Sequence, residues 1–183
     1  MSKADTTSRF TAKVLRPAMP DDAAWAFVLL PRPVSEKLPR RGRTTVDASI
    51  NGHRFQATLE PDGQLSHWLK LDSRLLKTVR AQAGDTVVLE VAPVKHEPEP
   101  ALPADLRQAL DDAPAAARAG WDATTTIARV DWIHWIVSAK QAKTRTQRVA
   151  AACDMLAAGK RRVCCFDPSG FYSKALAAPD AAE

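Results

Sequence analysis

The dipeptide Asn51-Gly52 restricts the fold of this chain more than any other local feature. A two-residue type I′ turn needs positive φ at both central positions, and asparagine and glycine adopt such angles at low cost. The flanking residues alternate between apolar and polar side chains, so pairing outward from the turn keeps one face apolar on both strands. The expected pairs are Ile50 with His53, Ala48 with Phe55, and Val46 with Ala57. The sequence therefore predicts an antiparallel hairpin over residues 46–59.

Other segments in the first half of the chain show the partial alternation that is typical of β-strands. They are residues 10–14, 25–29, 65–69 and 86–91. Turn-forming residues separate them, and residues 73–82 have the pattern of a short helix. Six short strands with one apolar face each bury that face best by closing on themselves. We therefore predict a small β-barrel.

Proline and glutamate mark a boundary near the middle of the chain. The residues concerned are Pro93, Glu97, Pro98, Glu99, Pro100 and Pro103. Proline fixes φ and lacks an N–H group, so this stretch can continue neither a sheet nor a helix. We predict a barrel domain at residues 1–95, a Pro/Glu-rich linker at residues 96–104, and a helical domain with an extended C-terminal tail at residues 105–183. The predicted fold class is α+β.

Helical spacing of apolar residues begins after the linker, at Leu102, Leu106 and Leu110. Residues 127–139 are apolar on nearly every side, which is typical of a helix in a core or between domains. Within that stretch we expect Trp132 and Trp135 to pack the two domains together.

The last helix has recognisable start and stop signals. Thr144 and Gln147 have the spacing of a capping box, and Gly159 is a helix terminator. The following tail, residues 163–172, is too rich in aromatic residues for a free terminus. We expect it to dock as an extended segment with a turn at residues 167–170.

The composition favours a cytoplasmic protein. The 183 residues are 45% hydrophobic and 26% charged, which is enough apolar material for one or two folded domains. The first ten residues are polar and carry no apolar signal core, and the longest apolar run, residues 23–31, is half the length needed to span a bilayer. We therefore expect no membrane partner.

Three cysteines are too few for a secreted disulfide framework. Cys164 and Cys165 are adjacent, so one interpretation is that they form a strained and reducible vicinal disulfide. The more ordinary interpretation is that both are small buried hydrophobic side chains. The sequence leaves open whether these two thiols are redox active.

Two basic clusters are candidate anion-binding sites in a chain with a net charge of +5. The first lies in a stretch, residues 32–43, that prolines and a glycine should keep irregular, and its guanidinium groups suit phosphate or carboxylate. The second follows the apolar helix and surrounds the last one. The selected residues are Arg40, Arg41 and Arg43 in the first cluster, and Lys140, Arg145 and Arg148 in the second. The alternatives are a solvated loop in the first case and charge–dipole stabilisation of a helix end in the second.

No catalytic constellation is recognisable, so we expect no enzymatic activity. Asp131, His134 and Ser138 lie on one helix, and a nucleophile, base and acid on one helix face rarely converge on a substrate. The chain has no Gly-x-Ser-x-Gly elbow and no Gly-rich phosphate loop. The four histidines are scattered, and His53 and His67 are expected at one end of the barrel. We accordingly predict no catalytic residue, no cofactor and no metal site.

Several of these segments together resemble a bacterial two-part family. They are the hairpin at residues 46–59, Gly84-Asp85-Thr86-Val87, Trp135-Ile136, Ala139-Lys140 and Thr144-Arg145 with Arg148. The N-terminal part resembles domain of unknown function 1905, and the C-terminal part resembles the YdeI/OmpD-associated, or bacteriocin-protection, family. The resemblance covers about residues 9–175, and Lys143 stands where that family usually has an acidic residue.

Membership would imply a double-split β-barrel, the architecture of AbrB- and MazE-like transcription factors, and no established reaction. The function we predict is therefore a non-catalytic cytoplasmic binding protein in stress or bacteriocin tolerance, with an anionic small molecule or a protein as its partner. The alternative is a nucleic-acid-binding regulator of the AbrB-like barrel type. The sequence specifies neither the ligand nor the oligomeric state.

Overall fold

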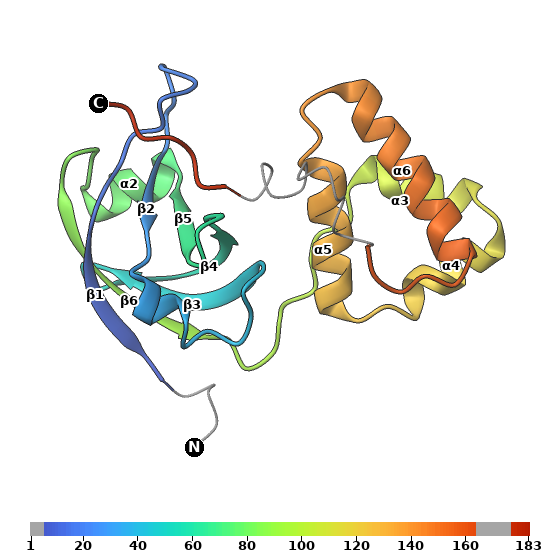
Figure 1. The fold of residues 1–183 in the computed structure, drawn as a ribbon, viewed down its shortest axis with the longest axis horizontal. Coiled ribbons are helices and arrows are strands. Elements are labelled where there is room, and N and C mark those ends of the chain that lie inside the picture. Colours follow the sequence, from blue (N-terminus) through green and yellow to red (C-terminus); the bar gives the residue numbers. More distant parts are fainter. Residues whose placement is uncertain (1–5, 164–176) are drawn as a thin grey trace. The chain divides into compact units, whose positions relative to one another are not determined.

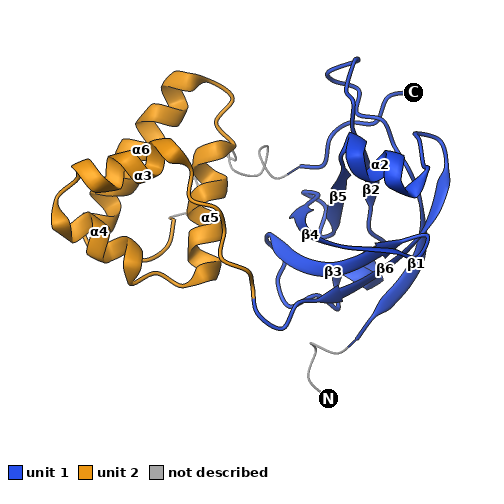
Figure 2. Ribbon diagram, turned by 180° about the vertical axis from the view of Figure 1, so that it is seen from behind, with its two compact units in different colours: residues 1–96, 171–183 blue, residues 97–170 orange. Residues whose placement is uncertain are grey.

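The computed structural model describes residues 6–163 and 177–183. The chain divides into two compact units (Figure 2). One comprises residues 1–96 and 171–183, and the other comprises residues 97–170. The first is a barrel of strands and the second consists of helices, so the α+β fold class is confirmed (Figure 1).

The barrel unit is one antiparallel six-stranded sheet in the order β1-β6-β3-β4-β5-β2. Its elements are β1 (Ser8–Lys13), β2 (Ala26–Leu29), α1 (Arg32–Ser35), β3 (Thr44–Ile50), β4 (His53–Pro61), β5 (His67–Leu71), α2 (Ser73–Val79) and β6 (Thr86–Pro93). The chain just after β1 meets β2, because Leu15 donates to Phe27 O at 2.8 Å and Phe27 donates to Leu15 O at 2.9 Å. This exchange brings the two edges of the sheet together into a nearly closed barrel.

The hairpin of β3 and β4 has the predicted register. Ile50 pairs with His53, Ala48 with Phe55, and Val46 with Ala57. The turn residues Asn51 and Gly52 have φ of 49° and 88°, as a type I′ turn requires. The side chains of β3 on this face are buried and form part of the barrel core, in which each fully buried aliphatic side chain contributes about 1.5–3 kcal/mol.

Helix α2 lies at one end of the barrel and places Leu75, Leu76 and Val79 against the core (Figure 1). Its start is fixed by Asp72, whose carboxylate accepts a hydrogen bond from the Leu75 N–H at 2.7 Å. Its end is fixed by Arg80 in the left-handed region, with φ of 52°.

Two expectations for the barrel unit were wrong in detail. The strand expected from Leu65 begins at His67, because Leu65 occupies a turn with φ of 68° and is 57% exposed. The stretch expected to be irregular contains α1, a single helical turn that Pro33 tolerates because proline suits the first positions of a helix.

The helical unit contains α3 (Ala104–Asp112), α4 (Ala115–Asp122), α5 (Thr126–Val137) and α6 (Ala142–Ala157). Trp132 is fully buried in the core of this unit, in edge-to-face contact with Trp135 at 6.1 Å between ring centroids. Its burial is therefore explained within the helical unit, whereas we expected it to pack the two domains together.

The two ends of α6 differ in how well the sequence predicted them. The helix begins at Ala142 after Gln141, so Thr144 lies within the first turn and the predicted capping box does not form. At the other end, Gly159 has φ of 87° and its N–H donates to Leu156 O at 3.0 Å. This glycine ends the helix as expected.

The described C-terminal residues, 177–183, belong to the barrel unit and not to the helical domain to which we assigned them. Ala18 donates to Asp180 O at 2.7 Å, and Ala182 donates to Arg16 O at 2.8 Å. The segment after β1 offers backbone groups that the sheet leaves unused, and the chain end pairs with them. Cys164, Cys165 and the expected turn at residues 167–170 lie outside the described residues.

Candidate binding site

The first predicted basic cluster, Arg40, Arg41 and Arg43, lies between α1 and β3. Arg43 donates to Glu60 of β4 at 2.5 Å, and its side chain is only 21% exposed. Arg40 is half-buried and Arg41 is exposed. The Arg43 guanidinium therefore connects this loop to β4, which is a structural role.

A buried histidine holds the same loop in place. His67 Nε2 lies 2.9 Å from Gly42 O, and its Nδ1 lies 2.6 Å from Ser35 Oγ. A carbonyl oxygen can only accept, so Nε2 carries the proton and Nδ1 accepts from the Ser35 hydroxyl. Burial lowers the pKa of His67, and the nearby Arg41 lowers it further, while the Gly42 carbonyl and Asp62 act in the opposite direction.

The second predicted cluster also has partners within the protein. Arg145 of α6 donates to both carboxylate oxygens of Asp105 in α3, at 2.6 and 3.1 Å. This bidentate contact lowers the pKa of Asp105 and raises the pKa of Arg145. Arg145 thus ties the last helix to the first helix of the unit.

Arg148 contacts the C-terminal end of α5. It donates to Trp135 O at 2.5 Å and to Ser138 Oγ at 3.2 Å, and its guanidinium lies 5.4 Å from the centre of the Trp135 ring. Burial lowers the pKa of Arg148. Lys140, the third selected residue, is exposed. The second cluster thus combines one exposed lysine with two arginines that hold helices together.

Ser138, at the end of the helix that carries Asp131 and His134, contacts two other residues. Its hydroxyl donates to the Trp135 carbonyl at 3.1 Å and accepts from Arg148. Cys153 is a buried free thiol whose pKa is raised by burial and by Asp154. Within residues 6–163 and 177–183, no group of three metal-ligating side chains comes together.

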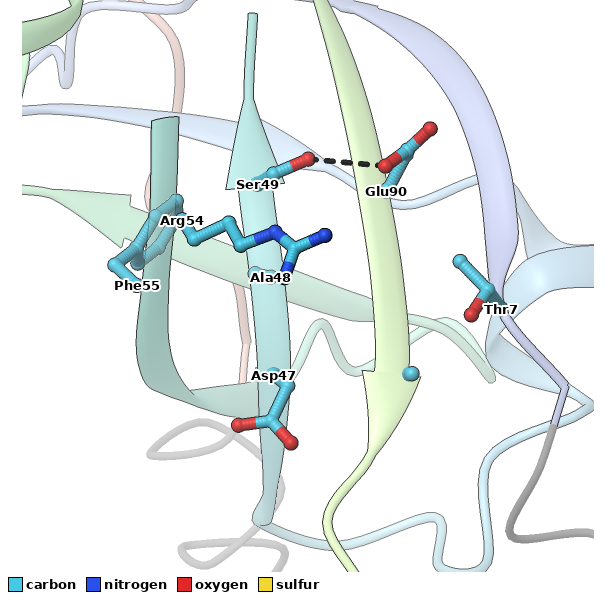
Figure 3. A pocket seen from close by; sticks show the side chains of 8 residues that line it. Thr7, Asp47, Ala48, Ser49, Arg54, Phe55 and Glu90 are labelled. Atoms are coloured by element: carbon cyan, nitrogen blue, oxygen red, sulfur yellow. Dashed lines mark hydrogen bonds between the residues drawn. The ribbon is translucent and has the colours of Figure 1, made fainter. Parts of the chain in front are cut away.

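One surface hollow of about 460 Å³ lies on the outer face of β3, β4 and β6 (Figure 3). The Arg54 side chain reaches from β4 across β3, between Asp47 and Glu90 (Figure 3). Ser49 donates to Glu90 at 3.3 Å, and Arg9 pairs with the same carboxylate at 3.3 Å. Cations and carboxylates thus alternate in this hollow, so it has no strong preference for an anion.

A second hollow, of about 270 Å³, is a groove between β4 and α2. Strand β4 contributes His53, Phe55, Gln56 and Ala57 to its wall. The end of β5 and α2 contribute Lys70, Asp72, Arg74, Leu75 and Thr78. We call this feature the β4–α2 groove.

The groove exists because β4 and β5 separate. Their ladder contains only Glu60 with Trp68 and Pro61 with His67, although β4 continues back to His53. Had the ladder continued, Thr58 would face Lys70 and Gln56 would face Asp72. Residues of α2 line the other side of the space left between these strands.

The charge of the β4–α2 groove favours an anion. Lys70 and Arg74 line it, while Asp72, the one carboxylate among its described lining residues, is held by the N-terminus of α2. Lys70 is positioned by Trp25, with its ammonium 4.6 Å from the ring centre. This groove could not be predicted from the sequence, because Lys70 and Arg74 look like ordinary exposed residues until the separation of β4 from β5 is known.

The described helices include none that is both long and apolar enough to span a bilayer.

No curated protein matches the chain. Residues 10–91 match the model of a domain of unknown function, DUF1905. Residues 99–159 match the model described as bacteriocin-protection, YdeI or OmpD-associated. The first match spans most of the barrel strands, from within β1 to within β6, and the second spans α3, α4, α5 and α6. The barrel therefore belongs to the DUF1905 family and the helical unit to the bacteriocin-protection, YdeI/OmpD-associated family.

Proposed function

We propose that this chain is a non-catalytic binding protein that takes an anionic ligand in the β4–α2 groove. The observation that carries the proposal is the pair of cations, Lys70 and Arg74, beside a concave surface whose single carboxylate is engaged as a helix cap. Apolar side chains of Phe55 and Leu75 line the same groove. A few placed charges on an apolar wall are typical of a ligand site.

Two further observations favour binding over catalysis. The Ser35–His67 contact has the geometry of a nucleophile and base, but both residues are buried, with exposed fractions of 6% and 1%. The second ring nitrogen of His67 is engaged by Gly42. A substrate therefore cannot reach this pair without displacing the loop that it anchors.

The internal contacts of three predicted arginines favour the groove as the anion site over the two basic clusters. Arg43, Arg145 and Arg148 each donate to a partner within their own unit. A ligand at these residues would have to compete with existing contacts. Nucleic-acid phosphates would face the same competition at these arginines, so we propose no nucleic-acid-binding function. The family description, bacteriocin-protection, supports a role for this binding in bacteriocin tolerance. That the role extends to stress tolerance and lies in the cytoplasm is part of the proposal.

Replacing both groove cations tests the proposal. In the double variant Lys70→Ala, Arg74→Ala we expect the affinity for citrate to fall by about two- to thirtyfold, because exposed charge pairs contribute about 0.2–1 kcal/mol each. Isothermal titration calorimetry at low salt measures the dissociation constants. Inorganic phosphate serves as a second, smaller anion.

Lys77→Ala is the matched control, since Lys77 is an exposed cation on the same helix but does not line the groove. We expect this variant to bind citrate as the original chain does. Equal losses in the control and in the double variant would mean that citrate responds only to overall charge, and the proposed site would be wrong.

A further inference from the structure

We infer that the ligand of the β4–α2 groove is an extended peptide segment of alternating acidic and apolar residues, which adds a strand to β4. This inference rests on the proposed function and specifies its ligand. Three features of the barrel support it: the direction of the β4 backbone groups, the absence of a neighbouring strand, and the side chains on each side of the opening.

The first feature is the direction of the backbone groups of β4. In a hairpin closed by a two-residue turn, the residues next to the turn form a hydrogen-bonded pair, and such pairs recur at every second residue. His53, Phe55 and Ala57 therefore direct their N–H and C=O groups toward β3. The intervening residues direct theirs away from β3. Asp62 lies an even number of residues after Arg54, Gln56 and Thr58, so its backbone groups should also point away from β3. Its N–H does so, because it donates to Ser66 O at 3.0 Å.

The second feature is that this other side of β4 is open. Arg54, Gln56 and Thr58 should each present an N–H and a C=O there. On the side away from β3, these three residues have no backbone hydrogen bond to another strand among the described residues. The ladder between β4 and β5 starts only at Glu60. An open strand edge of this kind is a template for another extended chain.

The third feature is the contrast between the two faces along this edge. The inward-facing side chains of Phe55 and Ala57 are partly buried and pack against the barrel core, as does Leu75 of α2. The opposite side of the opening carries the cations Lys70 and Arg74. A bound strand alternates its side chains between the two faces. Apolar side chains would pack inward on Phe55, and acidic side chains would meet the cations.

Amide hydrogen exchange of the full chain, resolved by residue with NMR, tests the inference. The probe is a capped peptide of about seven residues in which glutamate and valine alternate. On saturation we expect exchange at the amides of Arg54, Gln56 and Thr58 to slow by at least about tenfold, because each gains a strand partner. The amides of Phe55 and Ala57 are internal controls, since they already pair with β3.

A peptide of alternating lysine and valine is the charge control, and we expect it to leave all five exchange rates unchanged. A peptide variant with methylated backbone nitrogens should lose most of the affinity, because it cannot form the ladder. Equal slowing with the lysine peptide would contradict the charge argument.

The outcomes separate this inference from the proposed function. If citrate binds at Lys70 and Arg74 but the glutamate–valine peptide leaves the Gln56 amide unprotected, the strand is wrong and the anion site stands. If neither citrate nor the peptide binds, both proposals fail. Protection of Arg54, Gln56 and Thr58 in a peptide-free dimer would show that a second copy occupies the edge, which also contradicts the inference.

Discussion

Gly120→Ala should destabilise the helical unit by about 2–3 kcal/mol, even though alanine is the better helix former by about 1 kcal/mol. Gly120 lies in α4, where this helix crosses α6. A Cβ atom at this position would lie 2.5 Å from the carbonyl oxygen of Leu156 and 3.0 Å from its carbonyl carbon. Both atoms belong to the backbone of α6, so no change of rotamer relieves the clash and the two helices must move apart.

Urea unfolding followed by tryptophan fluorescence measures this effect, since Trp121, Trp132 and Trp135 lie in the helical unit. The matched variant is Ala119→Gly, at the neighbouring exposed position of α4. We expect a loss of at most about 1 kcal/mol there, from helix propensity alone. If Gly120→Ala instead stabilised the unit, the close crossing of α4 and α6 would be wrong.

His67→Phe should cost the barrel unit about 2–4 kcal/mol. The substitution keeps a planar ring at a site that is 1% exposed, but it leaves the Ser35 hydroxyl and the Gly42 carbonyl without their partner. Each buried polar group that loses its hydrogen bond costs about 1–3 kcal/mol. His67→Gln retains a donor and an acceptor, so we expect it to recover part of the loss in thermal unfolding. Equal losses in both variants would show that the two hydrogen bonds contribute little.

The same residue should make stability depend on pH. The pKa of His67 is lowered from 6.5 by burial, so the unfolded chain takes up a proton at a higher pH than the folded chain does. The stabilisation is therefore fully present above about pH 6.5 and is lost as the pH falls from there toward the folded-state pKa. Comparing the free energy of unfolding of the original chain and of His67→Phe across this range isolates the effect. A parallel dependence in the two proteins would contradict it.

Local sequence patterns predicted most of the barrel. The type I′ turn at Asn51-Gly52 determined the register of seven residue pairs, because a shift by one residue would turn every apolar side chain of β3 outward. Gly159 likewise marked the end of α6, since its φ of 87° is readily adopted only by glycine. In both cases the information lies within a few consecutive residues.

Features that depend on distant parts of the chain escaped the sequence analysis. Residues 177–183 pair with the segment that follows β1, more than 150 residues earlier, and no local pattern encodes that contact. The internal partners of the selected arginines depend on distant residues in the same way, because Arg43 and Arg145 pair with Glu60 and Asp105, which are 17 and 40 residues away in sequence. A cluster of basic residues in the sequence does not reveal which cations have internal partners.

We propose that the anion site is the β4–α2 groove and neither of the basic clusters. A citrate titration of the isotopically labelled full chain, followed through its backbone amide chemical shifts, tests this most directly. We expect the largest shifts on β4 from His53 to Ala57 and on Lys70, Arg74 and Thr78. Shifts concentrated at Arg40 and Arg41, or at Lys140 and Arg148, with the groove unchanged, would contradict it.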